Sequence, residues 1–162
     1  MTSNNVIDLL DYLSRWRLEF GILDSDREIT VEVNILNTDN KINIRKMKLK
    51  DVMFFTEYGT ITIPGKFILE KSLVLVNKLI DIRIGKLIDD IFEEDKNETY
   101  IQNQMNRLAL NIQDLVRNTM ISYIKHTNRL GEIIHKGEDE NKYLYDLIKL
   151  KNYVRCVAKF EN

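Results

Sequence analysis

The side chains that most often carry out catalysis are few in this 162-residue chain and far apart. Cys156, the only cysteine, lies beside Val154 and Val157 in the segment YVRCVAKF, which favours a small buried residue over a nucleophile. His126 and His135 are nine residues apart in a predicted helix, so they project in opposite directions and cannot share a metal ion. No HExxH, CxxC or glycine-rich phosphate loop occurs in the sequence. We therefore expect no catalytic residue, no metal site and no cofactor, and a protein that is not an enzyme. An acid–base pair assembled from distant Asp and Glu residues stays open.

Two charged segments are the best candidates for a binding surface. The first, NKINIRKMKLKD (residues 40–51), has five cationic side chains within ten residues and no acid before its last position. The second, DDIFEEDKNE (residues 89–98), is rich in carboxylates but lacks the spacing of an EF-hand calcium loop. Opposite charges in different places are typical of contacts between neighbouring subunits. The candidate interaction surface consists of Arg45, Lys46, Lys48, Lys50, Glu93, Glu94 and Asp95.

The basic segment admits two interpretations. Lysines on an edge strand prevent the strand from pairing with another chain, whereas a phosphate-binding site would use the same charges for nucleic acid. The net charge of −1 argues against a polyanionic partner attracted by the whole protein. A second basic strip, Lys125, Arg129 and Lys136, is weakened by Glu132 and the acids that follow. Nucleic acid is therefore disfavoured, and a small nucleic-acid-binding regulator that uses the run Lys41–Lys50 stays open as the alternative.

The acidic segment also admits two interpretations. Carboxylates at the C-terminal end of a helix oppose the helix macrodipole. Either the helix that precedes the segment ends near Asp89, or the negative patch has a partner. A solvated loop is the simpler interpretation and a basic partner surface is the other.

The first predicted element is a helix at the N-terminus. Apolar residues recur at three- and four-residue steps from Val6 to Phe20, and Ser3, Asn4 and Asn5 offer N-caps for a helix that ends at Phe20. Gly21 can adopt the left-handed conformation that ends a helix. Trp16 belongs to the apolar stripe, so we expect it in the core or at an interface.

A β-hairpin is expected next. Alternating apolar residues predict a strand over residues 29–35, and the polar residues 37–40 supply a turn. The alternation resumes at Ile42, but it changes phase further on, so we expect a bulge or a strand end near Lys46. Residues 49–63 fit either a short helix or another strand.

Three long helices should follow the hairpin. The first covers residues 66–95, and Gly85 within it indicates a kink or a close crossing. The second runs from a cap at Asn97 towards His135. The third starts in the segment EDEN, residues 138–141. The inward residues expected on the first helix are Leu69, Leu73, Val76, Ile80, Ile84, Leu87 and Ile91. Those expected on the second helix are Ile101, Met105, Leu108, Ile112 and Leu115, continued by Val116, Met120, Tyr123 and Leu130. Those expected on the third are Leu144, Leu147, Ile148, Val154 and Val157.

Together these elements predict an α+β fold that is mainly α. An N-terminal helix and a small antiparallel β-hairpin or meander occupy residues 1–65, and three long antiparallel helices form a bundle over residues 66–162, the two parts making one compact unit. The N-terminal segment does not resemble a signal peptide, and no run of about 20 apolar residues predicts a membrane span. We therefore expect a cytoplasmic protein that binds other protein subunits, as homo- or hetero-oligomers, and no membrane.

One family resemblance concerns the hairpin. The segment EITVEVNILNTDNKINIRKMKLKD resembles the N-terminal organisation of tail-assembly chaperones and baseplate-hub assembly proteins of tailed phages. The family pattern, an Ile, then an Arg, then Leu or Met, then an acid, is matched by Ile42 or Ile44, Arg45, Met47 or Leu49, and Asp51. The proline that commonly follows the arginine is lysine here.

The resemblance covers about 25 of the 162 residues. It implies a structural or assembly subunit of a phage tail or baseplate, in the host cytoplasm or in the virion. The composition, with 21 Ile and 16 Asn against two Ala and one Pro, indicates an AT-rich genome, as many phages have.

Overall fold

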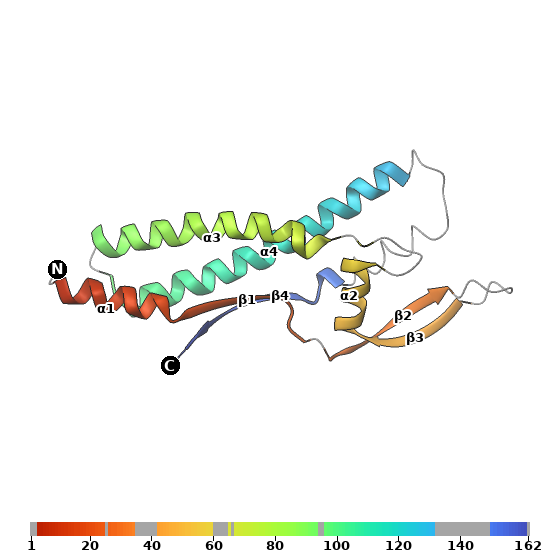
Figure 1. Cartoon of the computed structure of the whole chain (residues 1–162), viewed down its shortest axis with the longest axis horizontal. Coiled ribbons are helices and arrows are strands. Elements are labelled where there is room, and N and C mark those ends of the chain that lie inside the picture. The colour runs from red at the N-terminus through yellow and green to blue at the C-terminus, as the bar shows by residue number, and fades with distance from the viewer. Residues whose placement is uncertain are drawn as a thin grey trace. The chain divides into compact units, whose positions relative to one another are not determined.

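The computed structural model describes residues 3–24, 26–34, 42–59, 65, 67–93, 96–131 and 150–161 (Figure 1). Its elements are, in chain order, α1 (Ser3–Ser14), β1 (Trp16–Ile22), β2 (Glu28–Asn34), β3 (Ile42–Lys48), α2 (Leu49–Tyr58), α3 (Ile68–Glu93), α4 (Glu98–Gly131) and β4 (Val154–Phe160). Helices dominate, and the strands form two small sheets, β1–β4 and β2–β3. The predicted mainly helical α+β class, with an N-terminal helix, a hairpin and then long helices, is confirmed.

The chain divides into two compact units, each built from segments that are not consecutive. Unit 1 comprises Met1–Gly21, Leu69–Asn118 and Arg155–Asn162. Unit 2 comprises Ile22–Ile68 and Thr119–Val154. Unit 1 groups α1 and residues 155–160 of β4 with α3 and with α4 up to Asn118, whereas the sequence predicted a division into residues 1–65 and 66–162.

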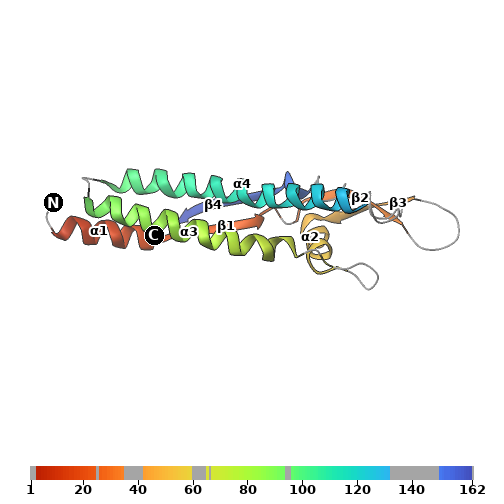
Figure 2. The same ribbon diagram turned by 90° about the horizontal axis from the view of Figure 1, so that it is seen from above.

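The core of unit 1 lies between the two long helices, which run antiparallel and side by side in both views (Figures 1 and 2). One face of α4 is buried as its spacing predicts, through Ile101, Met105, Leu108, Ile112 and Val116. On α3 the predicted Val76, Leu87 and Ile91 are buried, but Leu73 is 44% exposed and Ser72 is buried instead. In the N-terminal turns of α3, the buried side chains therefore lie one position earlier in the sequence than predicted.

The start of α4 is capped as predicted. The side-chain Oδ1 of Asn97 accepts a hydrogen bond of 3.0 Å from the backbone N–H of Tyr100. This bond satisfies one of the backbone N–H groups that have no partner within the first turn of a helix. Glu98 in the first turn adds a negative charge near the positive end of the helix dipole.

Two segments predicted as helical are strands. The first helix ends at Ser14 rather than at Phe20, and β1 follows it. Residues 154–160, expected in a third helix, form β4. Residues 150 and 151 are helical, and residues 138–149 of that predicted helix lie outside the described residues. Figure 1 shows β1 and β4 paired and running in opposite directions.

The pairing of β1 with β4 explains why the helical prediction was wrong there. The rings of Tyr12, Trp16 and Phe160 pack together, with centroids 4.6 Å apart for Tyr12–Phe160 and 5.5 Å apart for Trp16–Phe160. Apolar residues from Trp16 to Phe20 also alternate with Arg17 and Glu19, so the segment fits a strand as well as a helix. A partner strand at the far end of the chain selects the strand.

Unit 2 contains the predicted hairpin and a short helix. The register pairs Glu28 with Lys48 and Asn34 with Ile42, and every residue between has one partner. Of the two alternatives expected near Lys46, the bulge is therefore absent, and the strand end lies two residues further on, at Lys48. Residues 35–41, which include the predicted turn, lie outside the described residues.

The open choice over residues 49–63 is decided in favour of a helix for its first part, α2. Leu49, Val52 and Met53 on α2 are buried. Elsewhere in unit 2, Ile68, Met120, Leu150 and Val154 are buried too. The apolar face of α2 thus belongs to the core of this unit.

Candidate interaction surfaces

The base of the hairpin carries part of the predicted basic surface, and one carboxylate pairs with two of its lysines. The Nζ atoms of Lys48 and Lys50 lie 3.3 and 2.9 Å from Oδ1 of Asp26. Hydrogen bonds from Lys50 and Lys48 hold the pKa of Asp26 below its ordinary value, and Asp26 in turn raises the pKa of Lys50. All three side chains are largely exposed, so salt screens these pairs.

The other predicted charges are not part of this cluster. Lys46 is exposed and paired through its backbone with Thr30, and Arg45 is the register partner of Val31. Glu93 is exposed at the last position of α3, in unit 1, whereas the lysines belong to unit 2. Glu94 and Asp95 lie outside the described residues. Because α3 continues to Glu93, the interpretation that this helix ends near Asp89 is wrong.

An aromatic patch, missed in the sequence analysis, lies on α2 and the segment after it. It consists of Phe54, Phe55, Tyr58 and Phe67, which are 57%, 45%, 62% and 40% exposed. Each ring contacts another ring of the patch. The centroid distances are 5.9 Å for Phe54–Phe55, 5.0 Å for Phe54–Tyr58 and 6.2 Å for Tyr58–Phe67. Ring pairs in this distance range attract each other beyond the area that they bury.

The backbone at the end of α2 holds the patch in place. Gly59 ends the helix at a φ of 83°, and its N–H donates to the carbonyl of Phe55 at 2.8 Å. The N–H of Phe67 donates to the carbonyl of Glu57 at 3.0 Å, which brings the Phe67 ring to Tyr58. Phe67 has a positive φ of 49°, a conformation that costs a non-glycine residue about 1 kcal/mol or more.

The spacing of the patch could have been noticed in the sequence. Phe54 and Tyr58 are four residues apart, and Val52 and Met53 precede them. In a helix this spacing places the two aromatic residues on one face, beside the apolar face that Val52 and Met53 bury. Whether residues 49–58 form a helix had to be known first, and the sequence alone left that open.

Cys156 and His126 are the catalytic candidates that lie within the described residues. Cys156 is buried, and burial raises the pKa of its thiol to about 11, so the thiol is neutral near pH 7. Its backbone N–H donates to Oε1 of Gln113 at 3.4 Å. His126 lies within α4, and His135 lies outside the described residues. In the described part of the chain, no three His, Cys, Asp or Glu residues are grouped as metal ligands would be.

None of the helices described is both long enough and apolar enough to cross a bilayer.

The basic run can be tested directly against nucleic acid. We expect the protein to show no tight binding to a DNA or RNA oligomer in fluorescence anisotropy, because Asp26 partly neutralises Lys48 and Lys50. Replacing Arg45, Lys46, Lys48 and Lys50 together by serine should change the signal little. A phosphate site would instead give an affinity that falls with salt, by roughly 0.9 log units per log unit of salt for each phosphate contacted.

Asp26→Asn is the matched control for that experiment. The substitution releases Lys48 and Lys50 and leaves all four cations in place. A true phosphate site would bind more tightly in Asp26→Asn and would be lost in the fourfold serine variant. That pair of results would establish the nucleic-acid alternative.

Comparisons with known proteins do not place the chain in a family. No family model, curated protein or solved structure matches it significantly. The fold and its surfaces are therefore the basis for a functional proposal.

Proposed function

We propose that this chain is a non-enzymatic structural or assembly subunit that works by binding other protein chains, in the tail or baseplate of a tailed phage. The observation that carries the proposal is the aromatic patch. Four contacting aromatic side chains remain between 40% and 62% exposed. Contiguous exposed apolar side chains on a folded protein usually mark a place where another molecule binds.

The chemistry of the patch fits a protein partner. Aromatic side chains are enriched in the centres of protein interfaces, where a few of them supply most of the binding energy. The patch is also ordered before binding, because the ring contacts and the Phe67–Glu57 backbone bond already fix the side chains. A preformed surface loses less conformational entropy when a partner binds. The resemblance of the hairpin, which leads directly into α2, supports a phage assembly context.

Unit 1 adds a second group of exposed apolar side chains. Leu73, Val74 and Leu75 on α3 are 44%, 71% and 46% exposed. Ile82 and Phe92, further along the same helix, are both 60% exposed. A long helix that exposes this much apolar area is typical of a subunit that works within an assembly.

The proposal can be tested by size-exclusion chromatography with light scattering. The protein should be run alone at increasing concentration and then after co-expression with the products of neighbouring genes. We expect a defined oligomer or complex. Replacing Phe54 and Tyr58 by serine should weaken it at least about tenfold, since interface hot spots contribute about 2 kcal/mol or more.

A variant with Ile7 and Leu110 replaced by serine is the matched control. It removes two apolar side chains that are 61% and 58% exposed and belong neither to the aromatic patch nor to the exposed group on α3. Equal loss of the complex in both variants would show that general surface hydrophobicity, and not the patch, is responsible. A strictly monomeric protein that forms no complex with any neighbouring gene product would overturn the proposal.

A further inference from the structure

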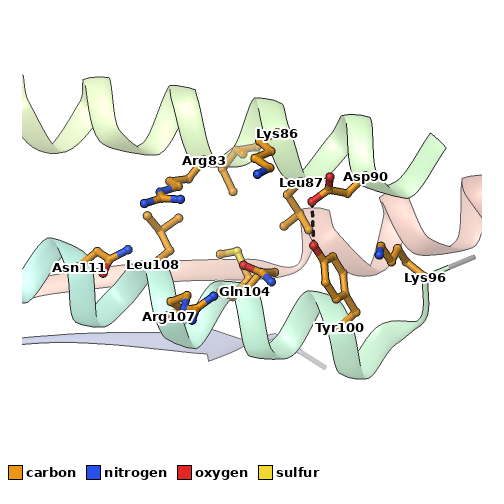
Figure 3. Close-up of a pocket in the computed structure, with 12 residues that line it drawn as sticks. Arg83, Lys86, Leu87, Asp90, Lys96, Tyr100, Gln104, Arg107, Leu108 and Asn111 are labelled. Atoms are coloured by element: carbon orange, nitrogen blue, oxygen red, sulfur yellow. Dashed lines mark hydrogen bonds between the residues drawn. The ribbon is translucent and has the colours of Figure 1, made fainter. Parts of the chain in front are cut away.

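A polar hollow lies between α3 and α4, within unit 1 (Figure 3). Its volume is about 380 Å³. Four cationic side chains line it: Arg83 and Lys86 from α3, Lys96 from the connection between the helices, and Arg107 from α4. Asp90 is the one carboxylate in the lining. Asp90 and Lys96 belong to the acidic segment 89–98, whereas Arg83, Lys86 and Arg107 lie outside both charged segments noted in the sequence.

The helical spacing places the lining residues along one groove. Arg83, Lys86 and Asp90 follow one another at three- and four-residue steps on α3. Tyr100, Gln104, Arg107 and Asn111 do so on α4. Residues at such steps share one face of a helix, so two antiparallel helices present two facing rows. In Figure 3 these side chains surround the space between the helices.

The carboxylate in the hollow is already engaged. The Tyr100 hydroxyl donates a hydrogen bond of 2.7 Å to Oδ2 of Asp90. The Lys96 ammonium lies 4.5 Å from the centre of the Tyr100 ring, over its face. Asp90, Tyr100 and Lys96 therefore form one connected end of the hollow. Arg83, Lys86 and Arg107, along the rest of the groove, make no ion pair with any carboxylate in the described part of the chain.

The floor of the hollow strengthens interactions with an anion. Leu87, Met105 and Leu108 line it and are each only 3% exposed. An apolar floor lowers the local dielectric constant and so increases the attraction between the surrounding cations and a bound anion. The amides of Gln104 and Asn111 supply neutral hydrogen-bond donors in the same row as Arg107.

We propose that this hollow binds an anion that carries two or more phosphate groups. Phosphates are favoured because two guanidinium groups, Arg83 and Arg107, can each donate paired hydrogen bonds to phosphate oxygens. More than one phosphate is favoured because the cations are distributed over the groove. Arg83 and Lys86 are about one turn apart on α3, Arg107 lies on α4 and Lys96 lies in the connection between the two helices. The site lies in unit 1 and is independent of the aromatic patch in unit 2.

Isothermal titration calorimetry with inorganic tripolyphosphate tests the proposal. We expect binding of one tripolyphosphate per chain, with a dissociation constant below about 1 mM at low salt. Serine at Arg83 or at Arg107 should weaken binding about tenfold each, which is the usual effect of losing a hydrogen bond to a charged group. Both side chains are exposed, so the variants should keep the melting temperature of the parent protein.

The charge-matched control replaces Lys46 and Lys78 by serine. Both lysines are exposed and neither lines the hollow. This control should bind tripolyphosphate like the parent, whereas Arg83→Ser/Arg107→Ser should not bind measurably. Absence of binding to the parent, or equal weakening in both double variants, would overturn the proposal.

Two further titrations define the ligand class. Citrate, a tricarboxylate of similar charge, should bind at least about tenfold more weakly, because it does not present tetrahedral phosphate oxygens to the two guanidinium groups. Citrate binding as tight as that of tripolyphosphate would contradict the assignment to phosphates. ATP should bind at least as tightly as tripolyphosphate. If ATP did not bind while tripolyphosphate did, the site would be restricted to inorganic phosphates.

Discussion

Replacing Gly65 by alanine lowers the free energy of unfolding by about 3 kcal/mol, because the new methyl group has no room. A Cβ at this position would lie 2.4 Å from the carbonyl oxygen of Glu57 and 2.5 Å from the carbonyl carbon of Tyr58. Both neighbours are backbone atoms at the C-terminal end of α2, so they cannot move aside as a flexible side chain could. Gly65 also lies two residues before Phe67, whose N–H donates to the carbonyl of Glu57 and so places the Phe67 ring in the aromatic patch.

Gly85→Ala is the control with the opposite expected sign. Gly85 lies inside α3, and no atom of the described residues lies within 4 Å of the position of an added Cβ, which argues against the close crossing, one of the two alternatives expected there. Alanine should stabilise the helix by about 1 kcal/mol. Urea denaturation followed by far-UV circular dichroism measures both variants. If Gly65→Ala were as stable as the parent, the packing of residue 65 against α2 would be wrong.

The second large effect is expected in the core of unit 1. Ile112 is completely buried in the middle of the apolar face of α4, between Leu108 and Val116. Replacing it by alanine removes three carbon atoms from a closed environment and leaves a cavity. Buried Ile→Ala substitutions of this kind cost about 2–5 kcal/mol. We expect the Ile112→Ala variant to unfold at a correspondingly lower urea concentration.

Leu110→Ala is the matched control for this prediction. Leu110 lies two residues away on the same helix, but it is 58% exposed. Its replacement should change the free energy of unfolding by less than about 0.5 kcal/mol, as is usual for exposed positions. A similar loss of stability in both variants would mean that α4 does not bury the face assigned to it.

Local sequence was sufficient for the long helices. The apolar steps on α4, the polar cap at Asn97 and the absence of proline all act within one or two helical turns. Such interactions depend only on neighbours in the chain, so their outcome can be predicted from it. The first strand of the hairpin was predictable for the same reason, since apolar and polar residues alternate over the whole length of β2.

Contacts between segments that are far apart in the sequence decided the elements that local patterns could not predict. Trp16–Phe20 satisfies both a helical and a strand pattern, and the pairing with β4 selects the strand. The ion pair between Glu19 and Lys159, across this sheet, joins residues 140 positions apart. No local signal can report such a contact, because its free energy exists only after the chain has brought both segments together.

Both binding surfaces proposed for this protein follow the same rule. The sequence by itself determined a mainly helical chain, the apolar faces of its long helices and the absence of the common catalytic motifs. Only the tertiary structure brought Phe67 to Tyr58 and set the row of Arg83 opposite the row of Arg107. The physical reason is that a surface made from two segments depends on how those segments pack, and packing is decided by the whole core.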